Sequence, residues 1–248
     1  KNNCYVIDNT SCFRMVEGIP LIVPEVNIDT LFKSKRKIIS NPNCSTIQML
    51  VALNPIHSKV TKISKVVVST YQSVSGAGQT AINELEEQTK SILNNKKIII
   101  KKIPKQIAFN VVPQIDIFLD NGFTKEEIKM VNETKKILDK NIDVNATCVR
   151  VPTFTGHAES IYFETEDDVP LSKIEGAFIN ETGIMFGKKE YHTPIDSSGE
   201  DWVFISRLRK DLVKENAFNF WVVSDNLLKG AALNSVQIAE HIVKNKII

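Results

Sequence analysis

The sequence predicts an α/β fold, because short apolar strands alternate with helical patterns along most of its 248 residues. The clearest strand, at residues 65–72, is apolar and β-branched, and a helical pattern follows at 79–93. An earlier change from strand to helix occurs at 37–53, and residues 203–208 and 217–223 alternate as antiparallel strands do. The length suffices for one large or two ordinary domains with a sizeable core.

The composition narrows the functional class. Hydrophobic residues make up 42% and charged residues 24% of the chain, as in globular proteins. The formal net charge of +2 gives no reason to expect a nucleic-acid or membrane partner. We find neither an apolar run of the ~20 residues that span a bilayer nor a secretory signal. The four cysteines are widely spaced without a CxxC motif, which predicts reduced thiols in the cytoplasm and no disulfide framework or metal site.

Three short strands are expected before the first long helix. Residues 4–7 form the first, and a polar turn follows them. Residues 20–26 form the second, which Pro24 interrupts. The third, at 37–39, leads through a turn rich in Pro and Asn into a helix at 47–53. Arg14 stands alone in this region, so it can bind an anion only with a partner from elsewhere in the chain.

Cys44 lies at or just before the start of the helix at 47–53. A helix N-terminus presents free backbone N–H groups and the positive end of the helix dipole, and both favour a thiolate over a thiol. Cys44 is therefore a candidate nucleophile. A buried apolar cysteine is the commoner alternative.

A loop containing two glycines, at residues 73–78, joins the strand at 65–72 to the next helix. Such a loop can bring backbone N–H groups close to a phosphate or ribose. The full GxGxxG pattern is absent, so a tight turn that starts a helix explains the loop equally well. Gln72, at the C-terminal end of the strand, is a candidate polar group of a pocket.

The next segments contain one strand edge and one helix. Residues 98–100 are flanked by lysine pairs and are expected to form a solvated strand edge. Thr124 and Glu127 have the spacing of a helix capping box. On that helix Glu126 and Lys129 lie three residues apart, as an ordinary surface pair would.

Arg150 and His157 bracket a Pro/Gly turn between a strand at 144–151 and another around 161–163. Arginine can bind a carboxylate through two hydrogen bonds, and histidine can transfer protons near neutral pH. One histidine at a turn is more often structural, yet together with Cys44 the pair fits a thiolate enzyme acting on an acidic substrate. Further helices are expected at about 171–180, within a polar stretch at 166–199, and at about 227–243.

Several separated motifs, in one order along nearly the whole chain, resemble those of the aspartate-β-semialdehyde dehydrogenase family. The matching stretches are Asp8-Asn9-Thr10-Ser11 with Phe13-Arg14-Met15, Pro24-Glu25-Val26-Asn27, Asn41-Pro42-Asn43-Cys44-Ser45-Thr46, Thr70-Tyr71-Gln72 with Val74-Ser75-Gly76-Ala77-Gly78, Glu126-Glu127-Ile128-Lys129, Arg150-Val151-Pro152 with Gly156-His157, and Asp225-Asn226-Leu227-Leu228-Lys229-Gly230-Ala231-Ala232.

The resemblance implies a reaction and a role for each matched residue. Enzymes of this family use NADPH to reduce β-aspartyl phosphate to L-aspartate β-semialdehyde and phosphate, which supplies lysine, threonine and methionine synthesis. Cys44 would form a thioester, His157 would act as general acid and base, and Gln72 would orient the substrate. Arg150 would bind the α-carboxylate of the substrate and Glu126 its amino group. Arg14 and Lys129 would bind the phosphoryl group or free phosphate. NADP, near its nicotinamide end, would contact Ser75, Gly76 and Asn226.

The resemblance also implies a domain organisation and an assembly. Residues 1–43 would be a remnant of a Rossmann-type NADP-binding domain, and 44–224 a catalytic and dimerisation domain with a mixed, largely antiparallel sheet and helices on one side. Residues 225–248 would form a helix that packs on the NADP-binding part. The family's glycine-rich NADP loop is absent from this sequence, so we expect an N-terminally truncated member. The implied assembly is a homodimer or homotetramer in the cytoplasm.

Two alternatives stay open. The chain could be another acyl-phosphate reductase or phosphorylating aldehyde dehydrogenase with a Cys–His pair, although Arg150 and Glu126 favour an amino-acid substrate. It could also be a catalytically incomplete dimerisation fragment of the family. A protein of that kind would dimerise but would not be stabilised by NADPH.

Overall fold

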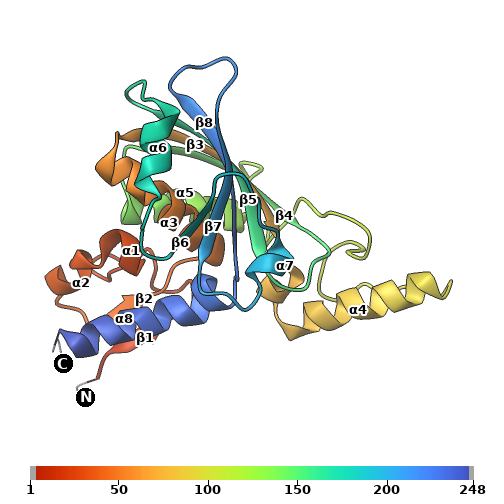
Figure 1. The fold of residues 1–248 in the computed structure, drawn as a ribbon. Coiled ribbons are helices and arrows are strands. Elements are labelled where there is room, and N and C mark those ends of the chain that lie inside the picture. Colours follow the sequence, from red (N-terminus) through yellow and green to blue (C-terminus); the bar gives the residue numbers. More distant parts are fainter. Residues whose placement is uncertain (1–3, 246–248) are drawn as a thin grey trace.

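The computed structural model describes residues 4–245, and a six-stranded mixed sheet forms its centre (Figure 1). The strands lie in the order β4 (Asp143–Arg150), β3 (Ile63–Gln72), β5 (His157–Thr165), β8 (Ala217–Ser224), β7 (Val203–Lys210) and β6 (Ile184–Gly187). β3 runs parallel to β4 and β6 to β7, while β3–β5, β5–β8 and β7–β8 are antiparallel. The expected α/β fold with a mixed, largely antiparallel sheet is confirmed.

Three helices pack on one face of this sheet. α3 (Cys44–Lys59) contacts β3, β5, β7 and β8, while α5 (Lys125–Ile137) packs on β4 and α6 (Leu171–Ala177) on β7. Their apolar side chains meet those of the sheet in the largest core cluster, where Met49 and Leu50 of α3 join Phe163, Phe218 and Phe220. Because α3 is buried along most of its length, its first turn is held firmly beneath the ends of the strands.

The two ends of the described chain meet beside a second, smaller sheet. β1 (Val6–Asp8) pairs in parallel with β2 (Ile38–Ser40), and α1 (Pro24–Asn27) and α2 (Asp29–Lys33) lie between them in sequence. The chain ends with a π-helical turn, η2 (Leu228–Ala232), and α8 (Leu233–Lys244), which lies against β1 (Figure 1). Ile39 of β2 and Ile238 of α8 share one apolar cluster. The division at residues 43 and 224 stays a prediction.

α4 (Gln79–Leu93) follows the short turn η1 (Val74–Ala77) and extends away from the sheet (Figure 1). It packs, with the segment that follows it, around a separate apolar cluster that contains Leu85 and Ile103. The buried carboxylate of Glu84 accepts hydrogen bonds from the backbone N–H groups of Lys101 (3.0 Å) and Lys102 (2.6 Å). Helix α4 therefore fixes the path of residues 101–103.

Most predicted elements are present, but several expectations were wrong. Residues 20–26 are not a strand: Leu21 forms one isolated bridge and Pro24 begins α1, since proline suits the first position of a helix. Residues 98–100 form no strand. The helix expected at 171–180 ends at 177, and both β6 and α7 (Pro194–Ser197) lie in the stretch predicted only as mixed and polar. None of the described helices combines the length and apolar character that crossing a bilayer requires.

Candidate active site

All ten site residues predicted from the sequence line one pocket of about 860 Å³. The pocket lies where the start of α3, the C-terminal ends of β3 and β4, and the turns η1 and η2 come together. The lining residues predicted from the sequence are Arg14, Cys44, Gln72, Ser75, Gly76, Glu126, Lys129, Arg150, His157 and Asn226.

Cys44 is the first residue of α3, and Asn43 caps that helix. The Asn43 side-chain oxygen accepts hydrogen bonds from the backbone N–H groups of Ser45 (3.0 Å) and Thr46 (3.3 Å). The backbone N–H of Asn43 is itself bonded to Glu133 at 2.7 Å. Within residues 4–245, the Cys44 N–H keeps no such partner, so it is the group of this turn that can still donate to a ligand.

The Cys44 thiol does not carry the thiolate that its helix position suggested. Burial, with a contribution from the charge of Glu126, raises its pKa to about 12, and the opposing influence of Arg150 is smaller. The expectation of a thiolate at the helix start was therefore wrong. Desolvation of the thiol outweighs the charge of Arg150 and the hydrogen bond from the Ser45 backbone N–H, both of which act to lower the pKa.

His157 begins β5 and is almost fully buried. Its Nδ1 accepts a hydrogen bond from the backbone N–H of Ser73 at 3.1 Å, which places the proton of the neutral ring on Nε2. Nε2 is buried and has no hydrogen-bond partner among the described residues. Burial and the nearby charge of Arg150 lower the His157 pKa to about 3. The ring is therefore neutral, with an uncommitted N–H donor at the pocket.

Gln72 and Arg150 stand side by side, because they are the last residues of the parallel strands β3 and β4 and are paired in register. Arg150 is buried, and its Nη1 donates to the Ser73 carbonyl at 2.7 Å. Arg150 forms no ion pair with any described carboxylate. The Gln72 side-chain nitrogen contacts Ser45 Oγ and Glu126 (3.2 Å), which leaves its buried oxygen without a partner.

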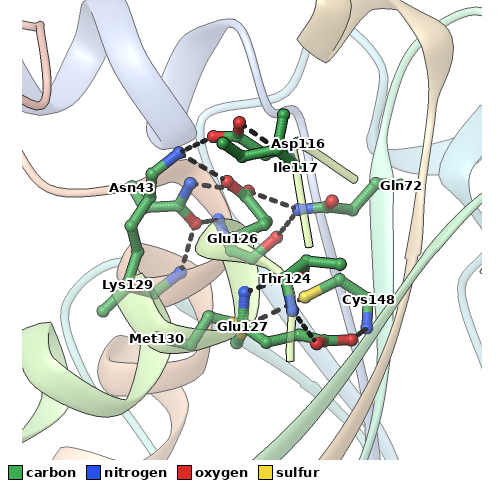
Figure 2. Close-up of polar contacts among 12 residues, drawn as sticks. Asn43, Gln72, Asp116, Ile117, Thr124, Glu126, Glu127, Lys129, Met130 and Cys148 are labelled. Atoms are coloured by element: carbon green, nitrogen blue, oxygen red, sulfur yellow. Dashed lines mark hydrogen bonds and ion pairs between the residues drawn. The ribbon is translucent and has the colours of Figure 1, made fainter. Parts of the chain in front are cut away.

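Glu126 is the centre of a polar network in the pocket wall (Figure 2). Its Oε1 accepts hydrogen bonds from Asn43 Nδ2 (2.7 Å) and Gln72 Nε2 (3.2 Å). Its Oε2 contacts Lys129 Nζ at 3.1 Å, and Lys129 also pairs with Asp116 at 2.9 Å. Burial acts to lower the pKa of Lys129, but the two carboxylates outweigh it and raise that pKa. Glu126 and Lys129, whose spacing suggested an ordinary surface pair, are thus part of a partly buried cluster.

Arg14 joins the same wall from the N-terminal segment. Its Nη1 pairs with Glu133 at 2.9 Å, and its other nitrogens donate to the backbone carbonyls of Thr10 and Asn9. Glu133 is almost fully buried and also accepts the Asn43 N–H, so it links Arg14 to the start of α3. The group that Arg14 meets is thus a carboxylate of α5 that neutralises it, and its anion-binding role stays a prediction.

Ser75 and Asn226 contact each other in the lining of the pocket. Asn226 Nδ2 donates to Ser75 Oγ at 3.0 Å, and Asn226 Oδ1 accepts from the Ser73 hydroxyl (3.1 Å) and the Gly156 N–H (2.9 Å). These bonds tie the η1 turn to the Pro/Gly turn before His157 and to the segment before η2. Asn226 is therefore a cross-link that holds three loops in one arrangement.

Two glycines keep open the space in front of the reactive side chains. A Cβ added at Gly76 would lie 3.1 Å from both Arg150 Nη1 and His157 Nε2. A Cβ added at Gly230 would lie 2.8 Å from the Cys44 Cβ, closer than such atoms approach. Together with Ser75 and Asn226 these glycines leave a gap bordered by small groups, which fits a flat ring such as the nicotinamide that the resemblance implies.

Sequence reasoning missed the supporting residues of the site. Asn43 could have been found, since asparagine directly before a helix is a common cap. Glu133 lies seven residues after Glu126 on the same face of α5, and that spacing was a usable signal. Nothing in the local sequence indicated Asp116 or Ser73, whose contacts come from distant segments. Among the described residues no group of His, Cys, Asp and Glu is arranged to hold a metal ion.

Comparisons with known proteins show the family of the chain. The family model for the semialdehyde dehydrogenase dimerisation domain matches residues 53–229. The aspartate-semialdehyde dehydrogenases of Aquifex aeolicus and Bacillus subtilis are each 51% identical to the chain, and the match covers 100% of this chain and 75% of each relative.

Solved structures show the same similarity. Aspartate semialdehyde dehydrogenase II of Vibrio cholerae, complexed with ASA, matches with a TM-score of 0.93 and 49% identity, over 96% of this chain and 72% of that one. The Candida albicans enzyme with NADP, at 23% identity and a TM-score of 0.74 over 98% of this chain and 72% of that one, shows the shared fold. The chain therefore belongs to the aspartate-semialdehyde dehydrogenase family.

Proposed function

We propose that this protein catalyses the NADPH-dependent conversion of β-aspartyl phosphate to L-aspartate β-semialdehyde and phosphate, through a thioester on Cys44. The observation that carries the proposal is the meeting of Cys44, His157 and Arg150 in one pocket with the Glu126 network. This set supplies a nucleophile, a proton carrier, a cation for a carboxylate and an anion for an ammonium group. The reaction supplies lysine, threonine and methionine synthesis, for which the cytoplasm is the proposed compartment.

Cys44 is the proposed nucleophile. Its Sγ attacks the carbonyl carbon of the acyl phosphate, the C–S bond forms, and the C–O bond to phosphate breaks. The Cys44 N–H faces no competing acceptor, so it can stabilise the negative charge that develops on the carbonyl oxygen. Since burial and the charge of Glu126 raise the thiol pKa to about 12, the proton must leave Sγ as the C–S bond forms.

His157 is the proposed proton carrier. Its neutral ring presents Nε2–H toward the pocket, so it can donate a hydrogen bond to an oxygen of the substrate. To accept the Cys44 proton, the ring takes its other neutral tautomer, in which Nδ1–H donates to the Ser73 hydroxyl 3.1 Å away and Nε2 has a free lone pair. The imidazolium formed in that step can then protonate the oxyanion that forms when the thioester is reduced.

The charged residues are proposed to position the substrate. Arg150, which lacks a carboxylate partner, is suited to hold the substrate α-carboxylate. Glu126 would receive the amino group, and Gln72 would orient the reacting end through its unpartnered oxygen. Arg14 and Lys129 would hold the phosphoryl group, which must compete with the carboxylates already paired with them.

Ser75, Gly76 and Asn226 are proposed to border the nicotinamide end of NADP(H). When bound there, the cofactor would supply the hydride that reduces the thioester. The gap left by Gly76 and Gly230 brings that position next to Cys44 and His157. The protein's contribution is to hold the ring against the reacting carbon and to exclude water.

The test is phosphate-dependent reduction of NADP by this chain with L-aspartate β-semialdehyde, run in the assay direction opposite to synthesis. We expect turnover that Cys44→Ser abolishes without loss of folding. Turnover with glyceraldehyde 3-phosphate instead of aspartate semialdehyde would assign the chain to another phosphorylating dehydrogenase. A folded dimer with no turnover and no NADPH-induced rise in Tm would support the incomplete-fragment alternative.

We infer that the face of the six-stranded sheet opposite α3 forms a homodimer interface. Val67, Tyr71 and Trp221 lie on this face, opposite α3, and the Tyr71 and Trp221 rings contact each other at 5.6 Å between centroids. The matched family model is named for dimerisation and spans these strands. Sedimentation equilibrium should give a dimer that Val67→Asp weakens. A tetramer would require a further interface, and a monomer would refute the assignment.

A further inference from the structure

Four cationic side chains line the active-site pocket, and two of them are already neutralised. Arg14 pairs with Glu133, and Lys129 pairs with Glu126 and Asp116. The two others are Arg150 and Lys102. Neither forms an ion pair with a described carboxylate, so these two carry charge that a ligand can still neutralise.

Arg150 and Lys102 come from different walls of the pocket. Arg150 is at the end of β4, beside Gln72, where the proposed substrate carboxylate would bind. Lys102 belongs to the segment after α4. Its neighbour Ile103 packs with Val74 of η1 in one apolar cluster, and Ala77 of the same turn packs against that cluster. Lys102 therefore lies on the side of η1, the turn that carries Ser75 and Gly76.

The backbone of Lys102 is held in place although its side chain is exposed. Its N–H donates to Glu84 Oε2 at 2.6 Å, and the N–H groups of Lys101 and Ile103 donate to the same buried carboxylate. Three backbone donors and the amide of Gln88 (3.0 Å) satisfy Glu84, so it does not pair with the Lys102 ammonium. The hydrogen bonds to Glu84 fix the backbone position of Lys102 and leave the charge of its side chain available to a ligand.

We propose that Lys102 is an anion-binding residue of this pocket and that its ligand is a phosphate of the dinucleotide cofactor. This inference rests on the proposed function, because it assigns a residue to the cofactor of that site. The chemistry that Lys102 recognises is a phosphoryl oxygen, and inorganic phosphate is the other source of such a group. The dinucleotide is favoured because Lys102 lies beside η1, whose Ser75 and Gly76 are proposed to border the nicotinamide end of that cofactor.

The test is calorimetric titration of the whole chain with NADPH and, separately, with inorganic phosphate. The variants are Lys102→Met, which keeps the apolar stem without the charge, and Lys102→Arg, which keeps the charge. Lys101→Met is the matched control, since Lys101 pairs with Glu87 at 3.0 Å and does not line the pocket. All four proteins should unfold at similar temperatures, because neither lysine ammonium is buried.

We expect Lys102→Met to weaken NADPH binding about tenfold, which corresponds to about 1.4 kcal/mol. Lys102→Arg should stay within about threefold of the wild type and Lys101→Met within about twofold, and the loss should shrink in 1 M salt because the site is exposed. Weaker binding of inorganic phosphate alone would overturn the dinucleotide assignment. Equal NADPH affinity in Lys102→Met and Lys101→Met would refute the inference while leaving the proposed function intact. Failure of the wild-type chain to bind NADPH would refute both.

Discussion

Substitution of Asn43 tests whether this residue joins the capping of α3 to the Glu126 network. Asn43→Ser keeps a side-chain oxygen that can cap the helix but removes the Nδ2 donor that contacts Glu126 at 2.7 Å. Asn43→Asp keeps the cap equally well, since Asp and Asn are similar capping residues. It replaces the donor with a carboxylate oxygen that faces Glu126. The two variants therefore differ mainly in the charge that they set against Glu126.

The expected magnitudes follow from this geometry. Removing a hydrogen bond to a charged group costs about 2 kcal/mol, which is our expectation for Asn43→Ser. Two carboxylates about 2.7 Å apart would repel by about 6 kcal/mol at an effective dielectric constant of 20. Protonation of one carboxyl avoids most of that repulsion. For a carboxyl with an ordinary pKa of about 4.3, this protonation costs about 3.7 kcal/mol at pH 7 and about 1 kcal/mol at pH 5.

The pH dependence is the decisive readout. In folded Asn43→Asp one carboxyl pKa is raised above its unfolded value, so the folded state binds more protons than the unfolded state and stability falls as pH rises. Urea unfolding at pH 5, 6 and 7 should show that Asn43→Asp loses about 3 kcal/mol relative to Asn43→Ser across this range. A constant difference between the two variants would show that residue 43 and Glu126 are not in contact in solution.

Three other outcomes are expected. The pKa of His157 is lowered to about 3 in the folded state, so between pH 6.5 and 5 the unfolded state gains a proton that the folded state does not. Urea unfolding should therefore show that wild-type stability falls by about 2 kcal/mol more than that of His157→Gln over this interval. An equal loss of stability in the two proteins would contradict this expectation. Iodoacetamide at pH 7.5 should alkylate exposed Cys12 before Cys44, because burial raises the Cys44 pKa to about 12. Mass spectrometry measures the order of labelling, and earlier labelling of Cys44 would show an activated thiol. Gly230→Ala should lower turnover about a hundredfold, because its Cβ would press on Cys44, whereas Gly176→Ala, which meets nothing within 4 Å, should leave turnover unchanged.

The sequence was informative about the site wherever a local pattern placed a side chain at the end of an element. Cys44 follows a capping asparagine, and Gln72 and Arg150 end two strands that the fold sets side by side. Parallel strands bring their C-terminal ends to one edge of a sheet, so residues from distant stretches can meet there. That rule explains why side chains singled out from separate motifs line a single pocket.

Electrostatic properties could not be predicted in the same way. The helix position of Cys44 suggested a lowered pKa, but desolvation by the surrounding protein and the charge of Glu126 raise it, and no local pattern shows which distant groups will surround a residue. The pairing of Arg14 with Glu133 joins residues 119 positions apart, so only the fold reveals that this cation is already neutralised. The strand expected at 98–100 does not form; the Ile99 carbonyl accepts from the Gln88 side chain instead, a contact with α4 that no local pattern indicated.

Arg150 connects the two reactive groups through its charge. Its guanidinium acts to lower the pKa of Cys44, which favours the thiolate, and also lowers the pKa of His157, which disfavours the imidazolium. A carboxylate bound at Arg150 would offset both influences, so the thiol would hold its proton more tightly while His157 would accept one more readily. Binding of the proposed substrate there would thus shift the proton-accepting ability toward His157 when Cys44 must lose its proton.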